Sequence, residues 1–285
     1  MIHSYSVLVN TRNEEQNIRS CLSAIPVHHE IIVVDMESED LTVEIAKSYT
    51  SKVFTHKNLG YADPARSFAL SKATKDWVLI VDADEIVDPR LWVELDNVVE
   101  KNTWDVVEVP FRTWMFGREI LGGGWGPGQD WHERFFRRSM NILSDKVHQM
   151  FEVPKSARVL KLPFPGPCIL HFNYLDLEHF LEKYNRYTTI EAQNNFDGIK
   201  PGIHTFGQGL FKATKTFIRR FLVLRGYRDG GLGFLLALLM TNYSLVVWFK
   251  EVTMNRFSAR EPRESIRALY ERLKSDDSSF TSNIE

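Results

Sequence analysis

The sequence predicts an α/β fold, in which a mostly parallel sheet carries helices on both faces and a helical C-terminal segment follows. Apolar, β-branched runs alternate with helix-spaced segments over the first hundred residues, which is typical of a parallel sheet covered on both sides. Beyond about residue 205 only helical patterns remain and the charge balance reverses. We therefore expect a catalytic domain over 1–204 and a basic, apolar segment over 205–285.

The elements follow one another as strand, helix and strand. Ile18, Cys21, Leu22 and Ile25 have the spacing of one helix face. A strand is expected over 105–117, a glycine-rich loop leading into a strand over 122–138, and a strand that becomes a helix over 171–193. The earlier strands are expected at 5–11, 30–36, 52–56 and 77–84, and the earlier helices at 14–25, 41–49 and 64–74.

Composition excludes several protein classes. The chain has 285 residues, of which 44% are apolar and 25% charged, as in an ordinary globular protein. Its two cysteines lack a metal-ligand spacing, and the first residues read into a strand rather than a secretion signal. We expect a reduced, cytoplasmic protein that does not bind nucleic acid.

The late segment raises the question of a membrane. Residues 205–263 hold ten basic and three acidic side chains, whereas 1–204 hold 22 and 29. The stretch 206–225 is amphipathic, with Lys212, Lys215 and Arg219 opposite an aromatic face, and 231–248 is uncharged. Peripheral contact with the anionic inner face of the membrane is one interpretation. A helical hairpin packed on the catalytic body is the other.

Three predicted strands end in polar clusters: "NTRNEE" at 10–15, "DMESED" at 35–40 and "DADE" at 82–85. The carboxyl ends of parallel strands lie at one edge of the sheet, so these clusters should meet there. Asp82 and Asp84 point to one side and could share a divalent cation. A solvated acidic turn or a helix cap is the alternative. Because no glycine-rich phosphate loop is present, a nucleotide here must be held by side chains and a metal.

Taken together, these motifs identify a resemblance. "VNTRNEE", "IIVVDMESED", "ADPARSFALSKATKDWVLIVDADE" and "GQDWHERFFRR" resemble, in order and spacing, the GT-A fold, family 2 inverting glycosyltransferases, especially the lipopolysaccharide core β-glucosyltransferase type. The resemblance covers roughly 4–250. It implies transfer of a sugar from a nucleotide-sugar, normally a UDP-sugar, to a glycan or lipid-linked acceptor. The chain departs from the family in "DMESED" and in Ser67, where an Asn is common.

The resemblance also implies how the nucleotide-sugar is bound. Thr11, Asn13 and Glu14 would lie beside the nucleotide, and Asp35 would hydrogen-bond the base. Arg66 would lie near the diphosphate or the donor sugar.

A second set of residues would bind the cation, Mg²⁺ or Mn²⁺. Asp84 would ligate it, and Asp82 would face both the metal and the ribose. His148, in "KVHQMFE", would complete the metal shell, although a lone histidine in an apolar run is more often a core residue. His171 is a weaker candidate.

Inverting transfer also needs a carboxylate that takes the acceptor hydroxyl proton. Asp130 matches the family position, with Glu133 as the competitor; a loop cap and a surface ion pair are their structural alternatives. Arg134, Arg137 and Arg138 could steady a diphosphate or an anionic acceptor, or be exposed charges on an edge strand.

Other functions remain open at this point. A sugar nucleotidyltransferase would need a glycine-rich, basic loop after the first strand, and "NTRNEE" is not one. A dehalogenase-type phosphatase would place its nucleophile at the end of the first strand. A catalytically inactive nucleotide-sugar-binding or scaffold protein is the non-enzyme alternative. Trp114, Trp125 and Trp131 could stack on sugars or fill the core.

Overall fold

The computed structural model describes residues 3–140, 142–143, 151–197 and 206–281. Contacts divide the chain into two compact units. Unit 1 comprises Met1–Phe180 and Arg219–Leu236, and unit 2 comprises Leu181–Ile218 and Ala237–Glu285. The stretch 205–285 therefore contributes to both units.

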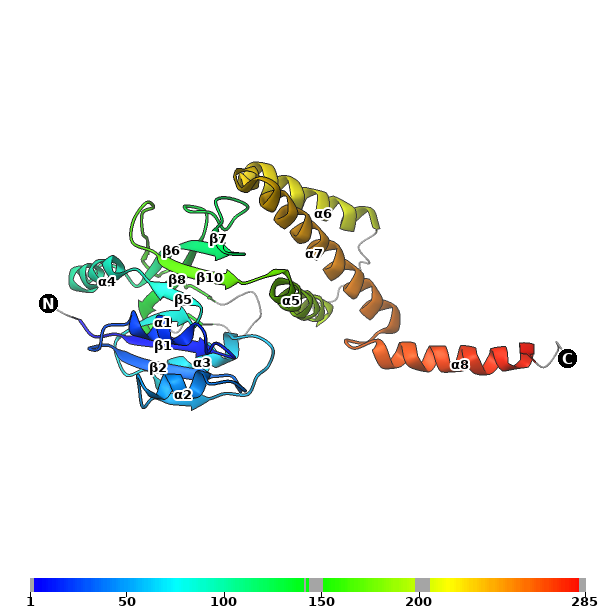
Figure 1. Ribbon diagram of the computed structural model, residues 1–285, viewed down its shortest axis with the longest axis horizontal. Coiled ribbons are helices and arrows are strands. Elements are labelled where there is room, and N and C mark those ends of the chain that lie inside the picture. Colours follow the sequence, from blue (N-terminus) through cyan, green and yellow to red (C-terminus); the bar gives the residue numbers. More distant parts are fainter. Residues whose placement is uncertain (1–2, 141, 144–150, 198–205, 282–285) are drawn as a thin grey trace. The chain divides into compact units, whose positions relative to one another are not determined.

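Unit 1 is built on a mixed sheet, in which the first four strands of the path are parallel (Figure 1). Ten strands are present among the described residues, with β7 and β9 paired to β6 beside the main path. The path runs β3 (Val53–Thr55), β2 (Glu30–Asp35), β1 (Ser6–Thr11), β4 (Trp77–Asp82), β8 (Trp131–Arg137), β6 (Val106–Met115), β10 (Ile169–Tyr174) and β5 (Glu85–Val87); β7 is Arg118–Glu119 and β9 is Val159–Lys161.

Helices cover both faces of the sheet, which confirms the predicted α/β fold. On one face, α1 (Ile18–Ser23), α2 (Thr42–Lys47) and α4 (Pro89–Lys101) pack against alternate residues of β1, β2 and β4. On the other face, α3 (Asp63–Lys72) buries Ala65, Ala69 and Leu70 against the remaining strand residues. Strands buried on both sides must be apolar throughout, and this explains the continuous hydrophobic runs in the sequence.

Local signals in the sequence explain where α4 begins and ends. Asp88 caps it by accepting a hydrogen bond from the Arg90 amide at 2.9 Å, and Pro89 occupies its first turn. Asn102 ends it in the left-handed conformation, with φ of +54°. Between these caps, Leu91, Leu95 and Val98 face the core.

Two strands are placed differently from the sequence-based expectation. The acidic cluster continues into β5, so Glu85 lies within a strand that pairs antiparallel with β10 and is fully buried. The suggested edge strand, β8, lies inside the sheet between β4 and β6. Its Arg134 is consequently buried rather than exposed.

Unit 2 is helical. Its helices are the later part of α5 (Leu177–Asp197), α6 (Phe206–Ile218), the later part of α7 (Gly230–Phe257) and α8 (Arg263–Thr281). Gly209 on α6 lies so close to Trp248 on α7 that an added Cβ would be 2.9 Å from the indole. Lys250 on α7 donates to Thr188 and Thr189 on α5 at 2.8 and 2.7 Å.

The amphipathic pattern of 206–225 is only partly realised. Ala213 is buried, but Leu210 and Phe211 are exposed rather than packed, and they adjoin Lys212 and Lys215. One stretch, Gly226–Phe257, is long and apolar enough by length and composition to cross a membrane, although core helices can meet the same criterion. The remaining elements are the short helical segments η1 (Arg138–Met140), η2 (Arg219–Val223) and η3 (Gly226–Asp229).

Candidate active site

The three polar strand ends lie side by side, as predicted from the sequence. The register pairs Thr11 of β1 with Asp35 of β2, and Asn10 of β1 with Asp82 of β4. Because these strands are parallel, their carboxyl ends form one edge of the sheet. The side chains at this edge divide into a group with unused hydrogen-bonding atoms and a group held by ion pairs.

The first group lies at the ends of β1 and β2. Both side-chain polar atoms of Asn10, Oγ1 of Thr11 and Oδ1 of Asp35 are buried without a hydrogen-bond partner in the described part of the chain. Oδ2 of Asp35 accepts from the Ser38 amide at 3.0 Å. Buried polar atoms are rarely left unpaired in folded proteins, so a cluster of them at one strand edge indicates a place where a ligand supplies the partners.

The loops that follow β1 and β2 are tied together. Asn13, with φ of +52°, donates its amide to Ser38 Oγ, while its side-chain oxygen accepts from the Glu39 amide, both at 2.8 Å. The Glu14 amide donates to Thr42 Oγ1 at 2.8 Å, and the Glu14 carboxylate accepts from Asn17. Asn13 and Glu14 thus shape the loops beside Thr11 and Asp35.

Asp82 belongs to the paired group. Arg66, from α3, donates to both of its carboxylate oxygens at 2.7 and 2.8 Å and also contacts Asp63 at 3.0 Å. Burial alone would raise the pKa of Asp82, but the adjoining charges of Arg66 and Arg134 hold it well below its usual range. Asp82 is therefore ionised and neutralised by its neighbours.

Glu85 and Arg134 form a buried ion pair beside Asp82. Nη2 of Arg134 is 2.7 Å from Glu85 and 3.2 Å from Asp82, so this arginine bridges the two carboxyl groups. Burial raises the pKa of Glu85 to about 7, and the nearby charge of Asp82 adds to that rise against the opposing effect of Arg134. Glu85 also accepts from the Asp82 amide at 2.8 Å.

Asp84 faces a histidine from a distant part of the chain. Its Oδ2 lies 3.6 Å from Nε2 of His171 on β10, and its backbone oxygen accepts from the Phe172 amide. Burial by itself would lower the pKa of His171, but Asp84, Glu85 and Asp82 outweigh burial and raise it. The fold thus brings His171, the weaker histidine candidate from the sequence, to Asp84.

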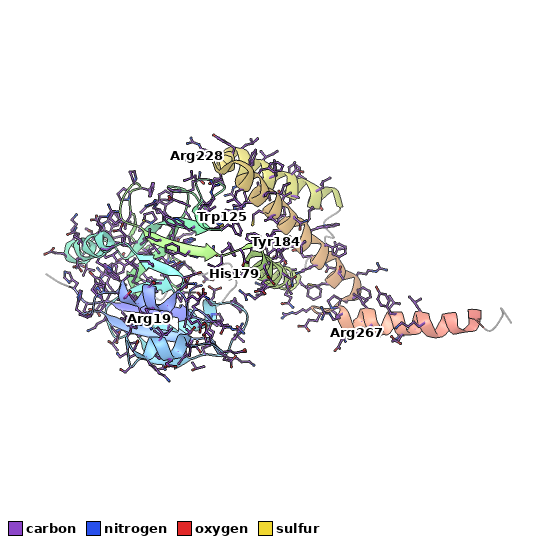
Figure 2. The ribbon with its side chains drawn as sticks, viewed as in Figure 1. Arg19, Trp125, His179, Tyr184, Arg228 and Arg267 are labelled. Atoms are coloured by element: carbon purple, nitrogen blue, oxygen red, sulfur yellow. The ribbon has the colours of Figure 1, made fainter. Side chains whose placement is uncertain are left out.

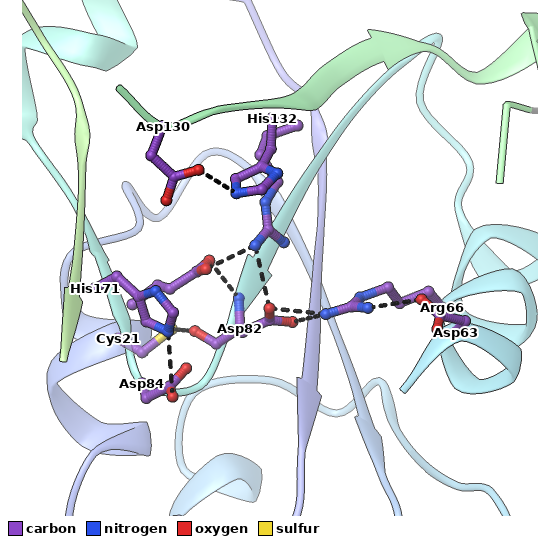
Figure 3. Close-up of polar contacts among 10 residues, drawn as sticks. Cys21, Asp63, Arg66, Asp82, Asp84, Asp130, His132 and His171 are labelled. Atoms are coloured by element: carbon purple, nitrogen blue, oxygen red, sulfur yellow. Dashed lines mark hydrogen bonds and ion pairs between the residues drawn. The ribbon is translucent and has the colours of Figure 1, made fainter. Parts of the chain in front are cut away.

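Asp130 directly precedes β8 and points toward the same cluster (Figure 3). Its Oδ1 is 3.0 Å from Nε2 of His132, and its side chain is 18% exposed. The ring of Phe111 packs against the rings of both His132 and His171, with centroid distances of 4.9 and 6.2 Å. The Asp130–His132 pair and the Asp84–His171 pair therefore both contact one phenylalanine through their histidine rings.

Sequence reasoning did not assign roles to His132, Glu85 or Arg220. His132 lies two residues from Asp130 on a strand, a spacing that places both side chains on the same face and could have indicated their contact. Of the predicted site residues, His148 lies outside the described residues.

Comparison with known proteins identifies the family to which the chain belongs. Residues 6–151, slightly more than half of the chain, match the family model described as glycosyl transferase family 2. The chain belongs to glycosyltransferase family 2. The resemblance inferred from the strand-end motifs is thereby confirmed, and the match includes Asp35, Asp82, Asp84 and Asp130.

Several individual proteins are also similar to this glycosyltransferase. It is 26% identical over 277 residues to the lipopolysaccharide core biosynthesis glycosyltransferase LpsC of Rhizobium meliloti, covering 90% of this chain and 94% of LpsC. It is 39% identical over 101 residues to an uncharacterised glycosyltransferase of Rickettsia typhi. That alignment spans about a third of each protein, 35% of this chain and 34% of the relative. Among solved structures, TarS 1–349 of S. aureus in complex with UDP-GlcNAc has a TM-score of 0.47 and 14% identity, covering 89% of this chain and 92% of TarS 1–349.

Proposed function

We propose that this glycosyltransferase moves a sugar from a UDP-sugar to a glycan or lipid-linked acceptor of the cell envelope, with inversion at the anomeric carbon. The observation that carries the proposal is the meeting of three features at one sheet edge: unpaired polar atoms at Asp35 and Thr11, the carboxylate of Asp84, and the Asp130–His132 pair. The similarity to LpsC over nearly its full length supports a lipopolysaccharide-type acceptor.

The nucleotide end of the site is suited to a pyrimidine base. Oδ1 of Asp35 is a buried acceptor without a partner among the described residues, and a uracil ring N–H is a donor that would satisfy it. Thr11 Oγ1, on the neighbouring strand, offers a hydroxyl to the same ligand. Asn13 and Glu14 act by holding the surrounding loops.

Asp84 is the residue suited to a divalent cation. Within the described ranges, no three His, Cys, Asp or Glu side chains converge as a ready-made metal cage. Mg²⁺ and Mn²⁺ need no such cage when one or two carboxylates act together with substrate phosphates. Asp84 fits that arrangement. Both carboxylate oxygens of Asp82 accept hydrogen bonds from Arg66, so Asp82 would ligate the cation only with an oxygen that also remains bonded to Arg66. The cation would neutralise charge on the departing diphosphate.

We assign the role of the base to Asp130. It accepts the proton of the acceptor hydroxyl as that oxygen forms a bond to C1 and the bond between C1 and the diphosphate breaks, with the electron pair leaving on UDP. The contact with His132 at 3.0 Å holds the carboxylate in one orientation. Arg66 and Arg134, paired with Asp82 and Glu85, keep the carboxylates behind the site neutralised.

Two measurements test this function. Calorimetry with UDP in the presence of Mn²⁺, and again after chelation, should show binding that depends on the metal. A screen of UDP-sugars for UDP release should then identify the donor. Asp84→Asn should remove the metal-dependent binding, whereas Asp88→Asn, a matched change at a helix cap, should leave it intact. UDP binding that ignores both the metal and Asp84→Asn would refute the proposed role of Asp84.

We further propose that the protein meets its acceptor at an anionic membrane surface. On α6, the exposed Leu210, Phe211 and Ile218 adjoin Lys212 and Lys215, a combination suited to a negatively charged bilayer. Flotation with anionic vesicles should recover the protein, and neutral vesicles should recover much less. If neutralising Lys212 and Lys215 leaves anionic binding unchanged, this part of the proposal fails.

A further inference from the structure

A cation from the late part of the chain reaches the catalytic unit. Arg220 lies in η2, within the segment of unit 1 that follows α6. Its Nη1 donates to the carbonyl oxygen of Gly123 at 2.7 Å, and its guanidinium carbon lies 4.2 Å from the centre of the Trp125 ring. The glycine-rich loop before β8 therefore holds this side chain in a defined position.

The loop and the turn that carries Arg220 form one structural piece. The Gly123 amide and Nε2 of Gln129 both donate to the carbonyl oxygen of Leu224, at 2.8 and 2.9 Å. At Gly122 the two backbones are so close that an added Cβ would lie 2.2 Å from the Arg225 oxygen. Gln129 is followed directly by Asp130, so these bonds connect the position of Arg220 to that of the proposed base.

The guanidinium of Arg220 has little to neutralise it. Among the described residues it makes one hydrogen bond, to a neutral carbonyl, and no ion pair. Burial and the neighbouring Arg219 lower its pKa to about 10, against an opposing contribution from Asp130, so it stays protonated at neutral pH. An arginine in this state can still donate to a carboxylate or phosphate, its preferred partners.

This step rests on the proposed function. Its stereochemistry decides whether Arg220 lies on the donor side or on the acceptor side of the transferred sugar. In an inverting displacement the base and the departing diphosphate are on opposite faces of the transferred sugar. Arg220 is bonded to Gly123, in the loop that leads directly into Asp130, so it lies on the acceptor side. Arg66 and Arg134 are both engaged with buried carboxylates, whereas Arg220 has no carboxylate partner among the described residues.

We propose that Arg220 binds an anionic group, a phosphate or a carboxylate, on the acceptor sugar and so brings the acceptor hydroxyl to Asp130. The acceptor would then be an acidic saccharide rather than a neutral one. Trp125, held beneath the guanidinium, limits its movement.

Calorimetry on the full chain loaded with UDP and Mn²⁺ tests the proposal with three probes: methyl glucoside, glucose 6-phosphate and glucuronate. We expect at least one anionic probe to bind about tenfold more tightly than the neutral one, as one charge-assisted hydrogen bond allows. The phosphate and carboxylate arms identify the preferred anion. Equal binding of all three probes, or no binding of either anion, would overturn the proposal.

Variants separate recognition from folding. Arg220→Gln should abolish the anion preference, and Arg220→Lys, which keeps the charge, should retain part of it. Arg228→Gln is the matched control, because Arg228 is an exposed arginine on η3, the short helical segment that follows η2 (Figure 2). If Arg220→Gln has the melting temperature of the wild type yet keeps the preference for anionic probes, the proposal is wrong and Arg220 serves only to hold the glycine-rich loop. Should Arg220→Gln fail to fold, a reduced but still measurable preference in Arg220→Lys with an unchanged melting temperature would support the proposal, and full retention of the preference would contradict it.

The same titrations distinguish failure of this inference from failure of the proposed function. UDP and Mn²⁺ should bind equally to the wild type and to Arg220→Gln, because Arg220 lies on the acceptor side. If UDP binds and the sugars show no charge preference, only the role of Arg220 is wrong. If UDP does not bind the wild type at all, the proposed function itself is wrong.

Discussion

Glu30 and Asp35 begin and end the same strand, β2, and both are buried carboxylates, yet their surroundings differ. Glu30 is bonded by Lys52, Ser6 and both the amide and hydroxyl of Thr74, the last two at 2.9 and 2.8 Å. Asp35 has one oxygen bonded to the Ser38 amide, while the other is without a partner among the described residues.

The difference separates stability from function along one strand. At the amino end every Glu30 oxygen is occupied by the protein itself, which stabilises the folded state. At the carboxyl end, polar atoms are buried without a partner among the described residues, which costs stability, and the proposed function assigns them to UDP. Substitutions at the two ends should therefore affect different measurements.

The largest effect is expected at Asp130, on the functional side of the comparison. Asp130→Asn should reduce the transfer rate by about 10²–10⁴-fold, the usual contribution of a general base, with little change in melting temperature. Product formation under donor saturation measures it. Glu133→Gln is the control and should retain most activity; a larger loss in this control would transfer the role of base to Glu133.

The next largest effect is expected at Glu30, where substitution should change the stability of the protein and not its ligand binding. Glu30→Gln should lower the free energy of unfolding by about 1–3 kcal/mol at pH 7 while leaving UDP affinity unchanged. Urea denaturation measures it, with the exposed Glu39→Gln as control. Unaltered stability in Glu30→Gln would remove the contrast between the two ends.

The stability difference between the wild type and Glu30→Gln should depend on pH. Burial would raise the pKa of Glu30, but hydrogen bonds from Lys52, Ser6 and Thr74 lower it to about 2, against roughly 4.3 in an unfolded chain. The contribution of ionised Glu30 to the free energy of unfolding is therefore present above about pH 4.3 and is lost as the pH falls toward 2. The stability difference between wild type and Glu30→Gln should shrink over that interval; a constant difference would contradict the pairing.

Asp35 should give the converse result. Asp35→Asn can keep an oxygen for the Ser38 amide but places an NH₂ group opposite the ring N–H of uracil. We expect UDP affinity to fall by about 10–100-fold, the range for a lost hydrogen bond to a charged group, without loss of stability. Calorimetry and a thermal melt measure the two quantities; reduced stability with unchanged affinity would make Asp35 a structural residue.

The smallest effect is expected at Thr11. Thr11→Val preserves the shape of the side chain and removes a buried hydroxyl that has no partner in the described structure. The ligand-free protein should be as stable as the wild type or slightly more stable, while UDP affinity falls a few-fold. A clear drop in the melting temperature would show that the hydroxyl is bonded within the folded protein.

Several features were predictable from the sequence because they depend on local pattern and strand direction. Apolar runs ending in "NTRNEE", "DMESED" and "DADE" identified the parallel strands, and parallel strands necessarily bring such ends together. The caps of α4 and the family resemblance also follow from short-range motifs. The fold class and the chemical class of the protein were therefore accessible without coordinates.

The partners of the charged residues depend on contacts between segments far apart in the chain. Asp82 is paired with Arg66 and Arg134, sixteen and fifty-two residues away, and Asp84 faces His171 across two antiparallel strands. No spacing rule predicts these pairs, because strand order rather than sequence separation sets them.

The sequence by itself determined that one sheet edge carries an acidic cluster, because apolar runs and strand direction are local properties. Only the tertiary structure decided which carboxylates are neutralised, which polar atoms remain unpaired, and that Arg220 reaches the loop before Asp130. The physical reason is that burial and ion pairing are properties of packed neighbours, and packing brings together residues that the chain keeps apart.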